Sequence, residues 1–174
     1  MISIAPKDLK IHPVDLWLNQ WLLLTVGDRH AFNTMTVAWG SIGGMWQKPF
    51  VQVVVRPTRH TFKFIEKYST FTLCAFSESH RKALAYLGTK SGRDGNKIQE
   101  SGLTIIDSHA VDAPSFKEAE LILECKKIYW QDMNPHNFID TAIHRNYPAK
   151  DYHRIYFGEI VYVLADDSFK NSPE

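Results

Sequence analysis

Alternating apolar and polar positions mark much of this chain as β-structure. Within Glu120–Tyr129, for example, Leu121, Leu123 and Cys125 share one face while Glu124 lies on the other. This period of two is typical of a half-buried strand. Six segments rich in β-branched and aromatic residues are predicted strands: Trp21–Val26, Phe32–Trp39, Phe50–Arg56, Phe71–Phe76, Glu120–Tyr129 and Arg154–Leu164.

Helical patterns are fewer than strand patterns. They predict helices at Thr61–Tyr68, Ser79–Tyr86 and Asn137–Arg145, and a short turn around Asn96–Glu100. Thr61 is the expected N-cap of the first helix, and Gly88 is the expected end of the second. Because most strands follow one another without a helix between them, the prediction is an antiparallel β-barrel with helices packed outside, not a doubly wound parallel sheet.

The composition is that of an ordinary globular domain. The 174 residues include 20 Lys and Arg against 19 Asp and Glu, with 44% hydrophobic and 13% aromatic residues. A chain of this length is expected to form one domain, 1–174, whose core needs no disulfide or metal. A formal charge of +1 without a local run of basic residues provides no field for a polyanion, so no nucleic-acid partner is expected.

The cysteines and the N-terminal residues favour a cytoplasmic protein. Cys74 and Cys125 form no Cys-x-x-Cys pair, and buried free thiols in a reducing compartment are the expected state. The N-terminus has no basic region followed by a long apolar stretch, so no signal peptide is expected. The most apolar early segment, Trp21–Val26, is too short to cross a membrane, and no membrane partner is expected.

Several familiar motifs of enzymes are missing from the sequence. No Gly-x-Gly-x-x-Gly follows a strand, no Gly-x-Ser-x-Gly surrounds a serine, and Gly88–Gly92 lacks the glycines of a Walker loop. His136, Asp140 and His144 are spaced by four and could share one face of the predicted helix. A solvated helix face is the favoured interpretation, so no metal site is expected.

Three segments concentrate residues suited to a flat ring that carries a phosphate. Asn33–Gly40 is a strand with small hydroxylated side chains, whose main-chain groups at a barrel edge could pair with a heterocycle. The alternative is an internal strand with threonines on its hydrated face. Arg56–Thr61 places two guanidiniums and two hydroxyls at a helix start, which favours an anion site over a plain capped helix. Tyr86–Gly95 is a basic, glycine-rich loop that could wrap an anion, or form only a solvated turn.

The order of these segments resembles the flavin reductase-like family, and within it the flavoredoxin-type branch of FMN-binding split-barrel proteins. The resemblance runs from Asn33 to Ile160. The matching segments are Asn33–Gly40, Lys48-Pro49, Arg56–Thr61, Leu73–Phe76, Leu87–Asp94 and His153–Ile160. It implies a six-stranded antiparallel Greek-key split β-barrel that forms a homodimer with FMN at the dimer interface.

The resemblance also implies roles for individual residues. Thr34, Thr36, Ala38 and Trp39 match the segment that lines the isoalloxazine ring, largely through main-chain contacts. His153 matches a histidine near the flavin and the nicotinamide, although a barrel-edge histidine with a structural hydrogen bond remains the alternative. The residues matching the phosphate-binding segments, from the same or the partner subunit, are Arg56, Thr58, His60, Thr61, Lys90, Ser91 and Gly92.

The activity implied is an NAD(P)H-dependent flavin reductase, in which hydride passes from nicotinamide to flavin N5. The alternative is a flavoredoxin-type FMN electron carrier that is reduced by a redox protein partner and has no NAD(P)H site of its own. The common reductases carry a serine-rich segment and paired prolines near Lys48-Pro49, whereas this chain has Ser41–Trp46 and one proline. That departure leaves the electron donor, NADH or NADPH, undetermined.

Overall fold

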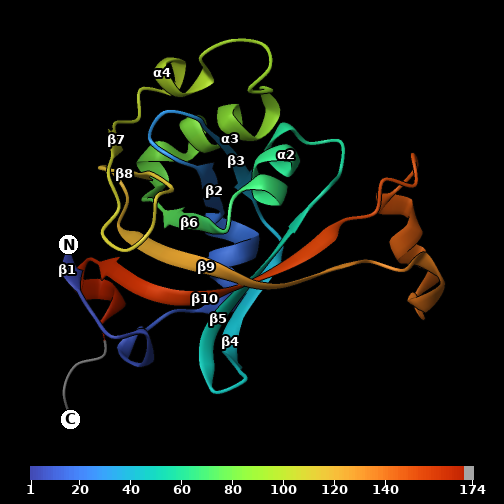
Figure 1. Ribbon diagram of the computed structural model, residues 1–174, viewed down its shortest axis with the longest axis horizontal. Coiled ribbons are helices and arrows are strands. Elements are labelled where there is room, and N and C mark those ends of the chain that lie inside the picture. Colours follow the sequence, from blue (N-terminus) through green and yellow to red (C-terminus); the bar gives the residue numbers. More distant parts are fainter. Residues whose placement is uncertain (171–174) are drawn as a thin grey trace.

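An eight-stranded antiparallel sheet forms the centre of the protein in the computed structural model, which describes residues 1–170 (Figure 1). Seven strands follow the order β3-β2-β6-β9-β10-β5-β4, and β1 pairs with β10. Their bounds are β1 Ile2–Ser3, β2 Leu22–Gly27, β3 Phe32–Val37, β4 Gly40–Met45, β5 Lys48–Val55, β6 Thr70–Ala75, β9 Leu121–Asp132 and β10 Arg154–Ala165. A separate pair consists of β7 Ile105–Ile106 and β8 Ser115–Phe116.

The six predicted strands are confirmed with small shifts at their ends, but the count of six is too low. The missed strand β4 has the sequence Gly-Ser-Ile-Gly-Gly-Met, which has little intrinsic strand preference. It forms because it pairs with β5 through a two-residue turn, Trp46-Gln47, in which both residues have positive φ. That turn geometry suits a tight hairpin and normally uses Asn or Gly. Because Trp46-Gln47 has neither residue, the local sequence does not predict the hairpin.

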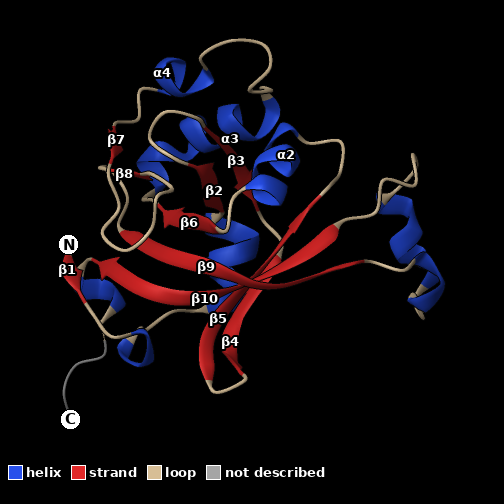
Figure 2. Cartoon of the chain, in the orientation of Figure 1, coloured by secondary structure: helices blue, strands red, loops and turns tan. Residues whose placement is uncertain are grey.

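The helices lie mainly against one part of the sheet (Figure 2). α2 (His60–Lys67) packs on β2 and β3, and α3 (Arg81–Thr89) packs on β3 and on α4 (Lys97–Ser101). A short α1 (Pro13–Asp15) continues into a π-helical turn, Leu16–Gln20. The 3-10 turns are Pro6–Asp8, Glu78–His80, Pro135–Asn137, Thr141–Asn146 and Asp167–Phe169. Among residues 1–170, no helix combines the length and the apolarity needed to cross a membrane.

Three details of the helix prediction are wrong. Arg59, not Thr61, is the N-cap of α2, and the Thr61 hydroxyl instead accepts a hydrogen bond from Asn33 Nδ2 at 2.7 Å. α3 continues through Gly88 to Thr89. A Cβ at Gly88 would lie only 3.1 Å from Cβ of Thr36, so glycine at this position lets α3 approach β3 closely. The predicted helix Asn137–Arg145 is replaced by two separate 3-10 turns, so its metal-capable residues do not share a continuous helix face.

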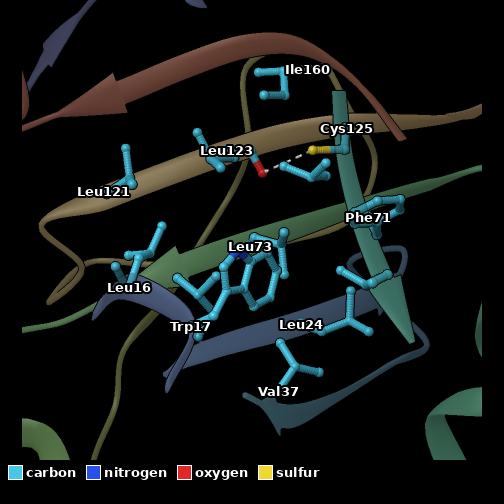
Figure 3. Close-up of a cluster of buried hydrophobic side chains, with 14 of the residues drawn as sticks. Leu16, Trp17, Leu24, Val37, Phe71, Leu73, Leu121, Leu123, Cys125 and Ile160 are labelled. Atoms are coloured by element: carbon cyan, nitrogen blue, oxygen red, sulfur yellow. Dashed lines mark hydrogen bonds between the residues drawn. The ribbon is translucent and has the colours of Figure 1, made fainter. Parts of the chain in front are cut away.

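The strand alternation divides the core into two clusters. Inside the barrel, the buried Trp17 belongs to one cluster with Leu24, Phe71, Leu73 and Leu123 (Figure 3). On the opposite face of β2, β6 and β9, the second cluster lies beneath α3 and contains Leu23, Cys74, Leu84, Phe116 and Ile122. Both faces of these three strands are therefore buried, which holds β3 in a fixed position at the edge of the sheet.

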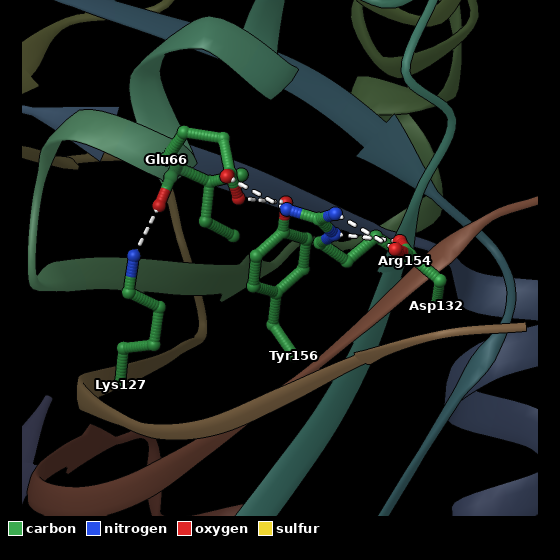
Figure 4. A network of polar contacts seen from close by, with 6 residues as sticks. Glu66, Lys127, Asp132, Arg154 and Tyr156 are labelled. Carbon is green, nitrogen blue, oxygen red and sulfur yellow. Dashed lines mark hydrogen bonds and ion pairs between the residues drawn. The ribbon is translucent and has the colours of Figure 1, made fainter.

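A polar network ties α2 to the long strands β9 and β10 (Figure 4). The Arg154 guanidinium donates to both carboxylate oxygens of Asp132 at 2.7 and 2.8 Å and to Glu66 Oε2 at 2.8 Å. The Tyr156 hydroxyl donates to the other oxygen of Glu66 at 2.6 Å. Arg154 also lies 3.9 Å above the ring of Trp130, so its planar group is held on several sides.

Candidate functional site

Two cavities meet along β3. The first, of about 190 Å³, is lined by the end of β3, the following turn, β5 and the start of β10. The second, of about 150 Å³, lies between β3, the start of α2 and the loop after α3. Met35 and Arg59 line both cavities, so together they form one elongated site with two differently built ends.

The first cavity combines a free strand edge with two rings. Thr36, Ala38, Trp39, Arg56 and His153 are among its lining residues. In the described part of the chain, residues 1–170, β3 is the last strand of the sheet and pairs only with β2, so its outer main-chain N–H and C=O groups have no neighbouring strand there. The rings of Trp39 and His153 lie 5.4 Å apart between centroids, and Trp39 is 43% exposed. The cavity is therefore suited to a flat heterocycle.

The hydroxyls of the two threonines predicted at this end are already hydrogen-bonded within the protein. The Thr34 hydroxyl donates to the Leu24 carbonyl at 3.2 Å and accepts from Thr25 at 3.0 Å, and Thr34 lines neither cavity. The Thr36 hydroxyl donates to the Leu84 carbonyl of α3 at 2.5 Å. Both hydroxyls thus hold β3 in place, and this part of the strand can offer a ligand mainly its main chain.

His153 is buried and uncharged at the first cavity. Its Nδ1 lies 2.8 Å from the Tyr147 hydroxyl, so one ring nitrogen has a partner within the protein. Burial, and then the positive charge of Arg56, lower the pKa of His153 to about 4. Burial also raises the pKa of Tyr147, which keeps that hydroxyl protonated. At neutral pH His153 can therefore offer a neutral hydrogen bond or a ring contact, but not a positive charge.

Arg56 lines the first cavity and not the second, whereas the sequence analysis groups it with the residues of the phosphate-binding segments. Its guanidinium donates to Asp151 Oδ1 at 2.8 Å and to the Asn146 carbonyl at 2.7 Å, and it lies 4.9 Å from the ring centre of Tyr147. The hydrogen bond from Arg56 lowers the pKa of Asp151. These contacts fasten the Met133–His153 arm, which projects beyond β9 and β10 (Figure 1), to the end of β5.

The second cavity is lined by cations and hydroxyls. Its lining includes six of the residues predicted to reach a phosphate: Thr58, His60, Thr61, Lys90, Ser91 and Gly92. It also includes Arg59 and Arg93, which belong to the two predicted anion-binding segments, and Asn33 and Lys97, for which the sequence predicts no contact with a phosphate. None of the lining residues is acidic. Burial, with the charges of Arg93, Lys63 and Lys97, lowers the pKa of His60.

Gly92 allows the loop to close onto β3. A Cβ at this position would lie 2.1 Å from Oδ1 of Asn33 and 3.1 Å from Cδ2 of His60. The first distance is too short for any side chain unless Asn33 or the loop moves, and the second would be a tight contact, so the space favours glycine. The close approach brings Arg93 and Lys97 to the cavity. Arg93 belongs to the predicted anion-binding loop Tyr86–Gly95, whereas the sequence places Lys97 only in a short turn and gives no signal that it reaches this cavity.

Comparison with known proteins places this arrangement in a family. Residues 19–173 match the model of the flavin reductase like domain. An uncharacterised protein of Pyrococcus abyssi is 31% identical over 115 residues, which cover 66% of this chain and 64% of that protein. The chain therefore spans just under two thirds of the length of this relative.

Two solved structures have the same fold. The flavoredoxin of Desulfovibrio vulgaris (Miyazaki F) is 27% identical with a TM-score of 0.67, covering 85% of this chain and 70% of that one. An NADH:FAD oxidoreductase of Streptomyces globisporus is 15% identical with a TM-score of 0.67, covering 86% and 76%, which indicates the fold alone. With its mainly antiparallel split-barrel fold, the chain belongs to the flavin reductase-like family.

Proposed function

We propose that the protein binds FMN along β3, with the ring in the first cavity and the phosphate in the second. The observation that carries this proposal is the meeting of the two cavities at Met35 and Arg59. One end offers a free strand edge and aromatic rings, and the other offers cations without an acid. A flat, polar heterocycle linked to a single anionic group matches both ends.

The residues of the second cavity fit the phosphate. Nδ1 of His60 is buried and has no hydrogen-bond partner within residues 1–170, which makes it available to a ligand atom. Nδ2 of Asn33 occupies one lone pair of the Thr61 hydroxyl, and the hydroxyl hydrogen remains for an acceptor in the cavity. Arg59, Lys90 and Arg93 would supply charge-assisted hydrogen bonds.

The first cavity would hold and orient the ring. The main-chain edge from Thr36 to Trp39 would pair with the polar rim of the heterocycle, and Arg56 would place a positive charge beside it. When bound, FMN would supply the redox chemistry by taking a hydride from a nicotinamide at its N5 atom. His153, neutral and held by Tyr147, would contact the ring or the nicotinamide without adding a charge.

We favour a flavin reductase that uses NAD(P)H as its electron donor. A further cavity of about 460 Å³ shares Ala38 and Trp39 with the ring cavity and is lined by apolar residues such as Pro13, Trp17 and Ile42. This volume is in the range of small-molecule sites and leaves space for a second flat substrate. The likeness to a flavoredoxin favours a second candidate function, an FMN electron carrier reduced by a redox protein.

A homodimer is part of the proposal. Trp46, Phe50, Tyr129 and Phe157 form an aromatic cluster in which each ring centroid lies within 6.0 Å of another. Trp46 is 56% and Tyr129 is 41% exposed. Phe50 is buried and Phe157 is half-buried, so Trp46 and Tyr129 form the exposed part of the cluster. Neighbouring exposed aromatic rings favour contact with another protein surface. We infer that a second copy covers it, which sedimentation of the wild type and of Trp46→Glu would test: a Trp46→Glu protein that still sediments as a dimer would contradict this assignment.

The flavin proposal has a direct spectroscopic test. The purified protein, supplied with FMN, is expected to show a protein-bound flavin absorption spectrum. Under anaerobic conditions, NADH or NADPH is expected to bleach it if the protein is a reductase. A yellow protein that only a reduced redox protein bleaches would indicate the carrier. A protein that takes up no FMN would overturn both.

A further inference from the structure

Lys97 is a buried ammonium without an acidic partner. The side chain is only 4% exposed, and its Nζ donates to the carbonyls of Leu87 and Lys90, each at 3.0 Å. These carbonyls lie at or just beyond the last turn of α3, where the helix has no internal donors for them. Among the ion pairs of residues 1–170, none involves Lys97. One of its three N–H groups therefore remains unused at the cavity wall.

The surroundings of Lys97 add positive charge rather than compensating for it. Arg59 before α2 and Arg93 in the loop line the same cavity, together with Lys90 and with His60, which has an unpartnered buried nitrogen. Isolated buried charges are costly unless a counter-charge accompanies them. The cavity is thus electrostatically incomplete without an anion.

We propose that Lys97 is a ligand of the terminal phosphate and makes this cavity select a phosphate monoester over a diester or an uncharged alcohol. The inference rests on the proposed FMN site, and it names the side chain that makes binding at that site depend on the charge of the ligand. A monoester carries about −1.5 to −2 charges at neutral pH, whereas a diester carries one. The more highly charged monoester offsets more of the positive charge of the desolvated ammonium and the two guanidiniums than a diester does.

This assignment also links binding to a proton. Burial, with the nearby Arg59 charge, lowers the pKa of Lys97 to about 8, and an adjacent phosphate would raise it again. At pH 8 the ammonium is about half populated before binding and almost fully populated afterwards, so binding takes up about half a proton. The other groups facing it are Arg59, Arg93, Lys90 and His60, whose own pKa is lowered.

The test compares FMN with riboflavin, which lacks the phosphate. Calorimetric titrations at pH 8 in two buffers of different ionisation enthalpy measure affinity and proton uptake together. Lys97→Met is expected to lower FMN affinity about 10- to 100-fold, as for a lost charge-assisted hydrogen bond, and to abolish the uptake, while leaving riboflavin affinity unchanged. Lys82→Met is the control, because Lys82 is exposed on α3 and lines neither cavity.

Each remaining outcome decides the inference. Equal losses for FMN and riboflavin would mean that Lys97 only supports the loop, and would overturn it. Wild-type protein that binds riboflavin as tightly as FMN would also overturn it, even if Lys97→Met does not fold. If the wild type binds no flavin, the proposed function fails separately. Inorganic phosphate then serves as the probe: a phosphate-dependent rise in Tm that is lost in Lys97→Met supports the site, and no rise in the wild type refutes it.

Discussion

Replacing Gly92 by alanine should separate ligand binding from folding. The new Cβ would lie 2.1 Å from Oδ1 of Asn33, a buried side chain that also donates to Thr61 at 2.7 Å. Either Asn33 or the loop must move, and overpacking of this kind typically costs about 1–3 kcal/mol. Because the loop is largely exposed and Asn33 is fixed between two elements, the loop is expected to move.

The cost should therefore appear mainly in the bound state. A displaced loop carries Ser91 and Arg93 away from the cavity, so FMN affinity is expected to fall about 5- to 150-fold, which corresponds to 1–3 kcal/mol. The free energy of unfolding without ligand is expected to change by less than about 1 kcal/mol, as for other substitutions in exposed loops. Urea titrations give the second quantity, and the quenching of flavin fluorescence gives the first.

Gly44→Ala is the matched control for this experiment. Gly44 lies on the exposed strand β4, and a Cβ there would meet no atom within 4 Å. Its FMN affinity and stability should stay close to those of the wild type. The steric reasoning is refuted if Gly92→Ala and Gly44→Ala have the same FMN affinity and the same free energy of unfolding. It is also refuted if the whole loss appears as reduced stability without ligand.

Two further predictions concern stability. His153 has a pKa of about 4 in the folded protein against an ordinary 6.5, so the unfolded chain takes up a proton on this residue at a higher pH than the folded protein does. The stability that the neutral, buried His153 provides is therefore complete above pH 6.5 and is lost as the pH falls from about 6.5 to about 4. The loss of unfolding free energy amounts to at most about 3 kcal/mol. In urea titrations across this pH range, the unfolding free energy of His153→Gln should fall less steeply with decreasing pH than that of the wild type. Parallel curves for the two proteins would contradict this prediction. Arg154→Met should cost about 1–3 kcal/mol in unfolding free energy because it strips Glu66 and Asp132 of their shared donor. Lys7→Met should change it by less than about 0.5 kcal/mol, since Lys7 is 85% exposed and its one ion pair within residues 1–170 is 4.0 Å long. Equal effects in the two variants would count against the network.

Local sequence patterns were sufficient for most strands and for the segments that form the anion end of the site. Strand periodicity identified β2, β3, β5, β6, β9 and β10 because each of them buries a face. The basic and hydroxylated segments at Thr58–Thr61 and Lys90–Gly92 were recognisable because few residue types suit an anion. The structure brings these segments together at one cavity, while their role in binding a phosphate stays a proposal.

What the sequence by itself determined, then, is a mainly antiparallel sheet and the residue types able to hold an anion, because hydrophobic period and side-chain chemistry are local properties. Only the tertiary structure decided which of those residues converge. It turned Thr34 toward Thr25, held Arg56 on Asp151 at the other end of the site, and paired the glycine-rich β4 with β5. It also buried Lys97 at the cavity wall. Each of these outcomes depends on contacts between segments far apart in the chain, which no local pattern encodes.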